Sequence, residues 1–167
     1  MRGACWMSVV LHLVGDPLAA RITRRAVNLP PASKDCFQTA SNWLQACLQH
    51  HSDCMKKDGY QQLPARVIDV GRPDGSGIPF LCNTNGGFGQ WVALSHCWGQ
   101  TDPLKTTSAT IKKHEESLPM RDLPPLFRNA VIITRRLGYQ YLWIDSLCII
   151  QDSKADWQAE SAHMGDI

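Results

Sequence analysis

The feature that most constrains the fold is a strand–helix–strand order between residues 91 and 144. The segment WVALS, which begins at Trp91, is apolar on both faces, so we expect it in the centre of a sheet. A helix is predicted over residues 125–137, and YLWI at residues 141–144 resumes as a buried strand. A crossover helix makes the two strands that it connects parallel. Their carboxyl ends then lie side by side if the strands are neighbours.

The helix over residues 125–137 has recognisable start and stop signals. Pro125 suits the first turn, and the basic pair Arg135 and Arg136 suits the negative end of the helix dipole. Gly138 is typical of a residue that ends a helix. The apolar stripe that should face the sheet is predicted to be Leu126, Ala130, Ile133 and Leu137.

Two further short strands with turns after them are predicted upstream of Trp91. ARVIDV is followed by a Pro-Asp-Gly turn and IPFLC by an Asn-Gly turn, and both patterns favour hairpins. Helices are expected over residues 34–51, with Ser33 as the cap, and from Lys154 onward. The predicted fold class is α/β: a small mixed sheet, made of an antiparallel meander and one parallel β-α-β unit, with flanking helices.

Composition and cysteine usage indicate a cytoplasmic protein. The chain has 167 residues, enough for one domain with a sizeable core, and its net charge of +2 gives no reason to expect nucleic acid. Its seven cysteines are scattered, unlike the disulfide framework of a small secreted domain. His12 interrupts the apolar run of a weak signal-peptide pattern, and no run reaches the ~20 residues that span a bilayer.

Polar residues follow both strands of the predicted parallel pair, where they form a predicted binding site. Ligands of open α/β sheets bind outside the carboxyl ends of the strands. An Asp after a strand also often caps the next turn through backbone hydrogen bonds, so both interpretations of Asp145 stay open. The residues of the predicted binding site are Ser95, His96, Trp98 and Gly99 after the first strand, and Asp145 and Ser146 after the second.

Several motifs, in order along the chain, resemble the heterokaryon incompatibility (HET) domain of filamentous fungi. They are NWLQACLQHHSDC, LPARVIDV, WVALSHCWG and LPPLFRNAVIITRRLGYQYLWIDSLCIIQDSKADWQAESAHM. Together they cover roughly residues 40–167. The LWIDSLCIIQD block, followed by DW and then by a Glu and a Met, is the most specific part.

The resemblance implies a signalling effector in fungal self/non-self recognition, innate immunity and programmed cell death. It implies an interaction module with protein partners or self-association, and by analogy a TIR-like architecture. Residues 1–33 would be a poorly ordered N-terminal extension, and residues 34–167 the HET-type domain. Family members continue with a Tyr, a helix end and a further apolar strand, so we expect a domain that is truncated at its C-terminal end.

Some TIR domains cleave NAD, and this likeness implies an alternative function as a NAD-cleaving enzyme. Glu160 or Asp145 would be the catalytic carboxylate, which stabilises the cationic sugar that forms as nicotinamide leaves. Trp98 or Trp157 would stack on a ring, and the spacing of Trp157 from Glu160 puts these two on one helix face. The competing interpretation is a surface Glu beside a Trp packed on the sheet. NAD is thus a candidate substrate, no cofactor is predicted, and enzymatic activity stays open.

A cysteine hydrolase is a further hypothesis for the same strand ends. Cys97 or Cys148 would be the nucleophile and His96 the base. Free cysteines are most often buried apolar residues, so this hypothesis is the weaker one.

A zinc site is the last candidate. Cys47, His51 and Cys54 recur at spacings of four and three, which places them on one side of a helix or helix end. A packed helix face that carries small thiols explains the same spacing. We therefore do not expect zinc.

Overall fold

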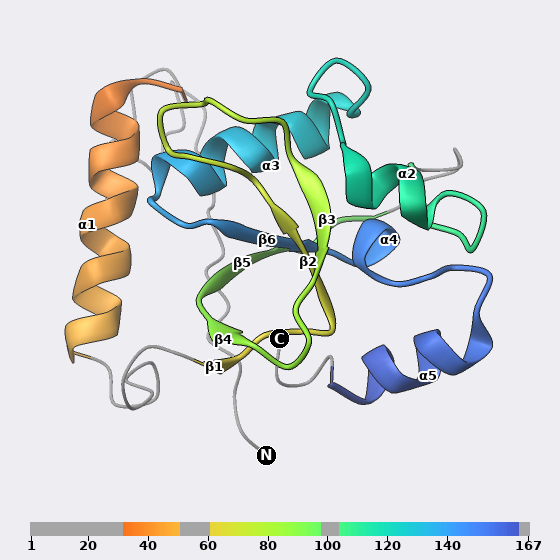
Figure 1. The fold of residues 1–167 in the computed structure, drawn as a ribbon. Helices are drawn as coiled ribbons and strands as arrows, with labels where there is room; N and C mark the ends of the chain where they lie inside the picture. Colours follow the sequence, from red (N-terminus) through yellow and green to blue (C-terminus); the bar gives the residue numbers. More distant parts are fainter. Residues whose placement is uncertain (1–31, 51–60, 98–103, 164–167) are drawn as a thin grey trace, which may run out of the picture. The chain divides into compact units, whose positions relative to one another are not determined.

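The computed structural model describes residues 32–50, 61–97 and 104–163. The chain divides into two units, Met1–Lys56 and Lys57–Ile167, each with its own contacts. The described part of the first unit is helix α1, Lys34–His50, drawn in orange in Figure 1. Ser33 caps it as predicted, because its Oγ accepts a hydrogen bond from the backbone N–H of Cys36 at 3.2 Å. His51, where the helix was expected to end, lies outside the described residues.

A four-stranded mixed sheet forms the centre of the second unit (Figure 1). In spatial order its strands are β3 (Phe80–Asn83), β2 (Arg66–Asp69), β6 (Tyr141–Ile144) and β5 (Trp91–Leu94). The strand β2 is antiparallel to both of its neighbours, whereas β5 and β6 are parallel. A smaller antiparallel pair joins β1 (Gln61–Gln62) to β4 (Phe88–Gly89). The α/β class predicted from the sequence is confirmed.

The predicted β-α-β unit is present. Strands β5 and β6 pair in register from Trp91 opposite Tyr141 to Leu94 opposite Ile144. Between them in sequence runs helix α3, Pro125–Arg136. The helix ends at Arg136, and Gly138 follows its C-cap with a φ of 85°, in the left-handed region that favours glycine.

The place of β5 in the sheet differs from the prediction. The hairpin of β2 and β3 is antiparallel as expected, but β5 pairs with β6 and stands at the edge of the sheet. The central parallel strand is β6, whose Leu142, Trp143 and Ile144 are 0–4% exposed. Apolar residues on both faces of a strand favour burial from above and below. They do not report how many strands lie beside it.

The buried face of α3 also differs from the predicted stripe. Leu126 and Ile133 are 47% and 42% exposed. Ala130 of the predicted stripe is buried, and Phe127, Val131 and Thr134 are buried with it. Successive residues are turned by about 100° around a helix, so the true buried face is displaced by about one residue from the stripe.

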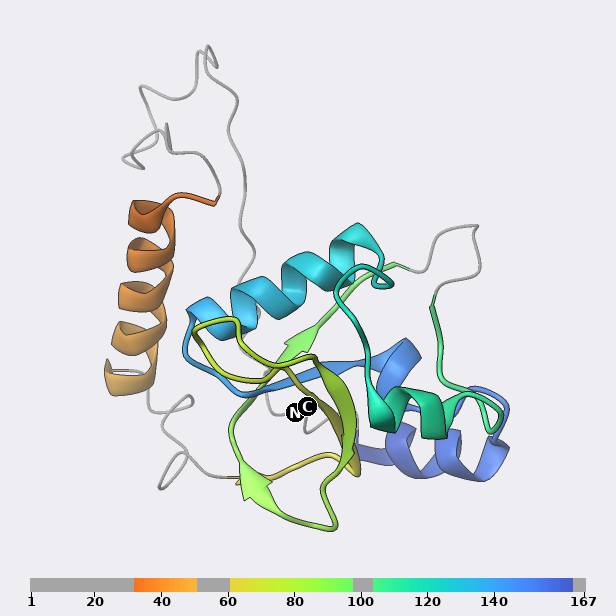
Figure 2. The same cartoon turned by 45° about the horizontal axis from the view of Figure 1, so that its top comes forward.

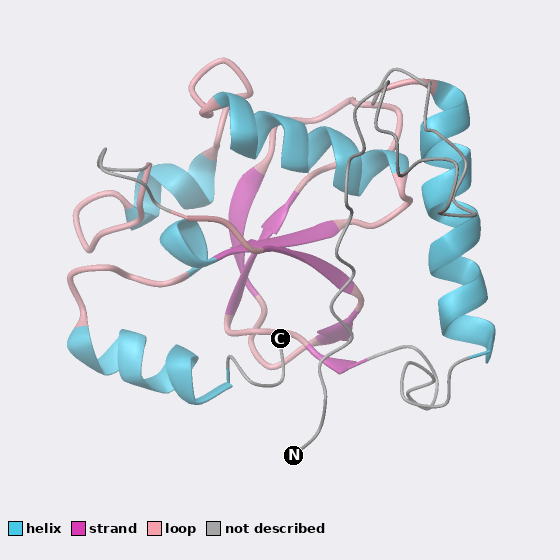
Figure 3. Ribbon diagram, turned by 180° about the vertical axis from the view of Figure 1, so that it is seen from behind, coloured by secondary structure: helices cyan, strands magenta, loops and turns pink. Residues whose placement is uncertain are grey.

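Three short helices complete the second unit: α2 (Ile111–Glu116), α4 (Asp145–Cys148) and α5 (Lys154–His163). The start of α5 at Lys154 agrees with the prediction. The helix α4 was not predicted; it is a single turn that begins directly where β6 ends. Figures 2 and 3 show α3 and α5 on opposite sides of the four-stranded sheet.

The core of the second unit lies around the two central strands. Burial of each large apolar side chain of this core contributes about 1.5–3 kcal/mol to the free energy of unfolding, before the entropy of ordering the chain is subtracted. The most deeply buried members, at 0–1% exposure, include Val67, Ile68, Val70, Leu81, Leu142, Ile144 and Leu147.

Candidate functional site

The parallel pairing of β5 and β6 brings His96 close to Asp145. The Nδ1 atom of His96 lies 3.8 Å from Oδ1 of Asp145. Each residue follows its strand closely, so the register of the pair carries both to the same edge of the sheet. The structure thus places these two predicted site residues together, at the position expected from the β-α-β order. We call this pair the His96–Asp145 site.

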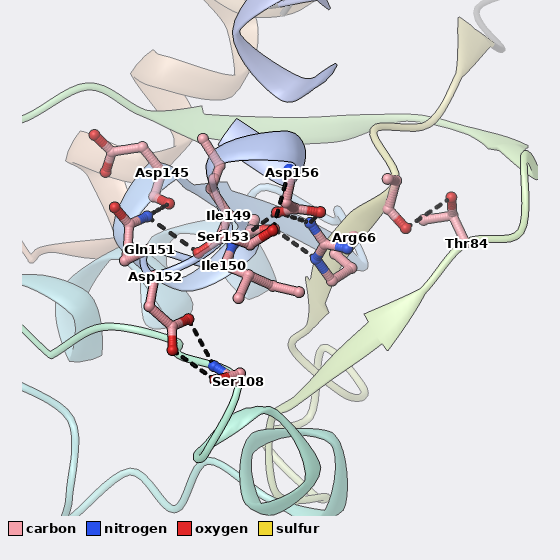
Figure 4. Close-up of polar contacts among 12 residues, drawn as sticks. Arg66, Thr84, Ser108, Asp145, Ile149, Ile150, Gln151, Asp152, Ser153 and Asp156 are labelled. Atoms are coloured by element: carbon pink, nitrogen blue, oxygen red, sulfur yellow. Dashed lines mark hydrogen bonds and ion pairs between the residues drawn. The ribbon is translucent and has the colours of Figure 1, made fainter. Parts of the chain in front are cut away.

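Asp145 also shapes the turn in which it lies. Its Oδ1 accepts a hydrogen bond from the backbone N–H of Ser146 at 2.7 Å. Its carbonyl oxygen accepts hydrogen bonds from Ile149 N–H at 3.2 Å and from the side-chain amide of Gln151 at 3.0 Å (Figure 4). The carboxylate side chain is still 27% exposed. The N-cap of α4 is Ile144, and no side-chain hydrogen bond caps this helix, so the capping interpretation of Asp145 stays a prediction; the carboxylate is accessible to solvent.

His96 is buried without a hydrogen bond to its ring. Its side chain is 7% exposed, and the ring meets Phe127 edge to face, with centroids 5.2 Å apart. Within the described part of the chain, neither ring nitrogen has a hydrogen-bond partner. Most buried polar atoms in proteins are paired, so an unpaired imidazole beside a carboxylate calls for a functional explanation.

The other residues of the predicted binding site differ in environment. Ser95 is exposed, whereas Ser146 is completely buried. The carbonyl oxygen of Ser146 accepts a hydrogen bond from Thr106 N–H at 2.9 Å, and its Oγ has no hydrogen-bond partner among the described residues. Trp98 and Gly99 lie outside the described residues.

Glu160 and Trp157 lie on the same helix, α5, but at different depths. Glu160 is 5% exposed and Trp157 is 53% exposed. The competing interpretation, a surface Glu beside a packed Trp, is therefore wrong. Two residues three apart share a side of a helix, yet one can face the core while the other faces solvent.

Cys148 is the last residue of α4 and is completely buried. Its complete burial raises the pKa of the thiol to about 12. The Ile144 N–H and Arg66 lower the pKa, while Glu160 and Asp145 raise it, so both carboxylates act electrostatically on this thiol. A thiol that stays protonated near neutral pH is a poor nucleophile. The geometry disfavours Cys148 in that role, while Cys97 is exposed.

The candidate zinc cluster is only partly within the described residues. Cys47 is half-buried on α1, and His51 and Cys54 lie outside the described ranges. Across residues 32–50, 61–97 and 104–163, no group of three or more His, Cys, Asp or Glu side chains is placed to hold a metal ion.

A second polar cluster, which the sequence did not predict, joins β2 to the segment after β6 (Figure 4). Nε of Arg66 donates to the carbonyl oxygen of Cys148 at 2.8 Å. Its Nη2 donates to both carboxylate oxygens of Asp156, at 2.6 and 2.5 Å. Asp156 also accepts the Ile150 N–H at 2.8 Å. We call these contacts the Arg66 cluster; Arg66 is far along the chain from the other three residues, and no local motif marks the contacts.

Buried Thr106 fixes the segment before α2 against the end of α4. Its Oγ1 shares a hydrogen bond of 2.9 Å with Nδ1 of His114, which is also buried. Burial lowers the pKa of His114, and the charge of Lys113 lowers it further. The Thr106 carbonyl accepts the Gln151 N–H at 2.9 Å. This contact supports the loop that follows the His96–Asp145 site.

The model of the heterokaryon incompatibility protein (HET) family matches residues 91–167. This match confirms the resemblance over that segment, which contains both parallel strands and the His96–Asp145 site. No curated protein and no solved structure matches the chain. None of the described helices is long and apolar enough to cross a membrane.

Proposed function

We propose that this chain, whose residues 91–167 match the HET family, acts in the cytoplasm as an effector of heterokaryon incompatibility. In this role it takes part in non-self recognition and in the cell death that follows. The observation that carries the proposal is the position of the family match. It encloses the parallel strand pair, the crossover helix and the polar residues at the strand ends, which form one structural unit.

The proposed mode of action is that of an interaction module with protein partners. Three large apolar side chains of the matched segment are 42–53% exposed: Leu126, Ile133 and Trp157. Large exposed apolar side chains are typical of surfaces that bind other proteins. Leu126 and Ile133 are seven residues apart on α3, so they lie on the same side of that helix.

The alternative is cleavage of NAD, and the His96–Asp145 site favours it over an inert domain. Asp145 supplies a partly exposed carboxylate at the carboxyl ends of parallel strands, where such a group can face a developing positive charge. Glu160 is buried and lies on α5 with its neighbour Trp157 turned to solvent. Between the two candidate carboxylates, the geometry therefore favours Asp145.

Consumption of NAD by the purified chain, fused to an oligomerising partner, separates the two modes. Asp145→Asn and Glu160→Gln are measured beside Glu116→Gln, which changes an exposed carboxylate on α2. An interaction module leaves NAD intact in all samples. NAD consumption that disappears in Asp145→Asn and persists in Glu116→Gln would contradict the interaction module and support a NAD-cleaving enzyme.

Expression in a filamentous fungus tests the role in incompatibility itself. Growth arrest and loss of viability are scored for the unchanged chain, for Leu126→Lys with Ile133→Lys, and for Asp145→Asn. The interaction module predicts that the double lysine variant loses the response while Asp145→Asn retains it. No response from the unchanged, folded chain would contradict the proposed function.

A further inference from the structure

The two edge strands of the four-stranded sheet, β3 and β5, differ in what lies beside them. At the β3 edge, helix α2 packs against the strand, and Leu118 N–H donates to the carbonyl oxygen of Pro79 at 2.6 Å. At the β5 edge, β6 pairs with one side of the strand. Within the described ranges, no strand pairs with its other side, and the backbone of Trp91–Leu94 has no hydrogen bonds beyond those to β6.

Exposure along β5 agrees with an open edge. In the register of the parallel pair, Val92, Ala93 and Leu94 lie opposite Leu142, Trp143 and Ile144. The three β6 side chains are 0–4% exposed, whereas Val92 and Leu94 are half-buried and Ala93 is exposed.

The β5 edge also lacks the charged residues and prolines that keep many edge strands from pairing. Natural edges carry lysine, proline, a bulge or an inward charge. The stretch from Gln90 to Ser95 contains no charged residue and no proline. An unpaired row of backbone donors and acceptors, with apolar side chains on both sides, is a template for another extended strand.

We propose that the open edge of β5 pairs with the β5 edge of a second copy of this chain, antiparallel, so that two four-stranded sheets become one continuous sheet. A second copy is the proposed partner because this strand can pair with itself without opposing like charges. A two-fold axis places the same strand against itself, which any charge at its centre would oppose, and this strand carries none.

The side-chain period of a strand restricts the register. A two-fold axis perpendicular to the sheet keeps each side chain on its own face, and residues directly opposite each other point to the same face. The numbers of two opposed residues must therefore have an even sum. With Ala93 opposite Ala93 of the second copy, Val92 lies opposite the Leu94 of that copy. This register puts two half-buried apolar side chains together.

The proposal rests on the proposed interaction module and names its self-association surface. One short strand per copy buries little area, so the dimer is expected to be weak. Sedimentation over a range from about ten micromolar to about one millimolar chain should show the mass rise from 18.6 kDa towards twice that value. A mass that stays at one chain throughout overturns the proposal.

Charge substitutions at the centre of the register make the test specific. Ala93→Lys alone and Ala93→Glu alone should each weaken the dimer at least tenfold, because like charges oppose each other across the axis. An equimolar mixture of the two should restore it, because the lysine then meets a glutamate. Ala93 is exposed and edge strands tolerate lysine, so both variants should fold, as circular dichroism would check.

Asn129→Lys and Asn129→Glu, at an exposed position on α3, are the matched controls. They should leave the dimer unchanged. Dimers that survive Ala93→Lys, or a mixture that fails to restore pairing, overturn the proposed surface. Because the readout is the mass of the purified chain, its failure is distinguishable from loss of the response in fungal cells.

Discussion

The His96–Asp145 site and the Arg66 cluster lie at the first and last residues of α4, and their buried polar groups differ in hydrogen bonding. The guanidinium of Arg66 has three hydrogen bonds, to Asp156 and to the Cys148 carbonyl. The ring of His96 is equally buried and has no hydrogen bond within the described residues. A paired buried group is explained by the stability of the fold, whereas an unpaired one costs stability and points to another role.

Cys148 adjoins both regions, and its reactivity gives the largest expected effect. At pH 8 a thiol of pKa about 12 has a thiolate fraction about a thousand times smaller than a thiol of pKa 9.0. Alkylation of Cys148 by iodoacetamide should therefore be at least about a thousandfold slower in the folded chain than in urea, with peptide mass spectrometry as the readout. Exposed Cys97 serves as the control, because it should react in the folded chain. Fast alkylation of Cys148 in the folded chain would instead support the hypothesis of a cysteine hydrolase.

Removing the charge of Asp156 should cause the largest loss of stability. Asp156→Asn leaves Arg66 buried without its counter-ion, which we expect to lower the free energy of unfolding by about 3 kcal/mol. The control is Asp122→Asn, which breaks the exposed pair of Arg121 and Asp122 and should change stability by less than about 0.5 kcal/mol. Urea denaturation measures both. Similar losses for the two variants would remove the distinction between the Arg66 cluster and an ordinary surface pair.

His114 is a buried histidine that does have a partner, so its titration sharpens the contrast with His96. Its pKa is lowered from 6.5 by burial and by Lys113, so the unfolded chain takes up a proton first as the pH falls. Stability should be complete above about pH 6.5 and decrease below it, by at most about 1.4 kcal/mol per pH unit, until the folded pKa is passed. In His114→Gln, the midpoint of urea denaturation should vary less with pH between pH 5 and 7.5 than it does in the unchanged chain. An unchanged slope in that variant would assign the titration elsewhere.

Replacing His96 by an apolar ring should have the smallest effect on stability. In His96→Phe the unpaired nitrogens disappear and the contact with Phe127 is kept, so the free energy of unfolding should change by less than about 1 kcal/mol, in either direction. Thermal and urea denaturation give the value. A loss as large as that of Asp156→Asn would show that His96 stabilises the fold as Arg66 does, and the comparison between the two regions would fail.

The sequence predicted the parts of the fold that depend on local signals. The caps of α1 and α3, the hairpin of β2 and β3, and the parallel β-α-β unit follow from turn residues, glycines and periodicity. The same reasoning predicted that His96 and Asp145 lie close together, because the carboxyl ends of neighbouring parallel strands lie at the same end of the sheet.

What the sequence could not predict depends on contacts between distant residues. The neighbours of β6 are set by packing of the whole sheet, so an apolar strand such as β5 could be placed in the centre when it stands at the edge. Arg66 and Asp156 are 90 residues apart, and each looks like an ordinary surface charge in its own segment. The depth of Glu160 is likewise set by how α5 packs, which its spacing from Trp157 does not reveal.

The order of strands in the sheet has a consequence for how the chain folds as it is synthesised. Strand β6 lies between β2 and β5, although both leave the ribosome before it. The hairpin of β2 and β3 can form early, but the sheet stays in two pieces until about residue 144 has emerged. Pairing across such sequence separations is slow. Until β6 emerges, the nascent chain carries unpaired apolar strand edges, and chaperones that shield such edges should govern its yield.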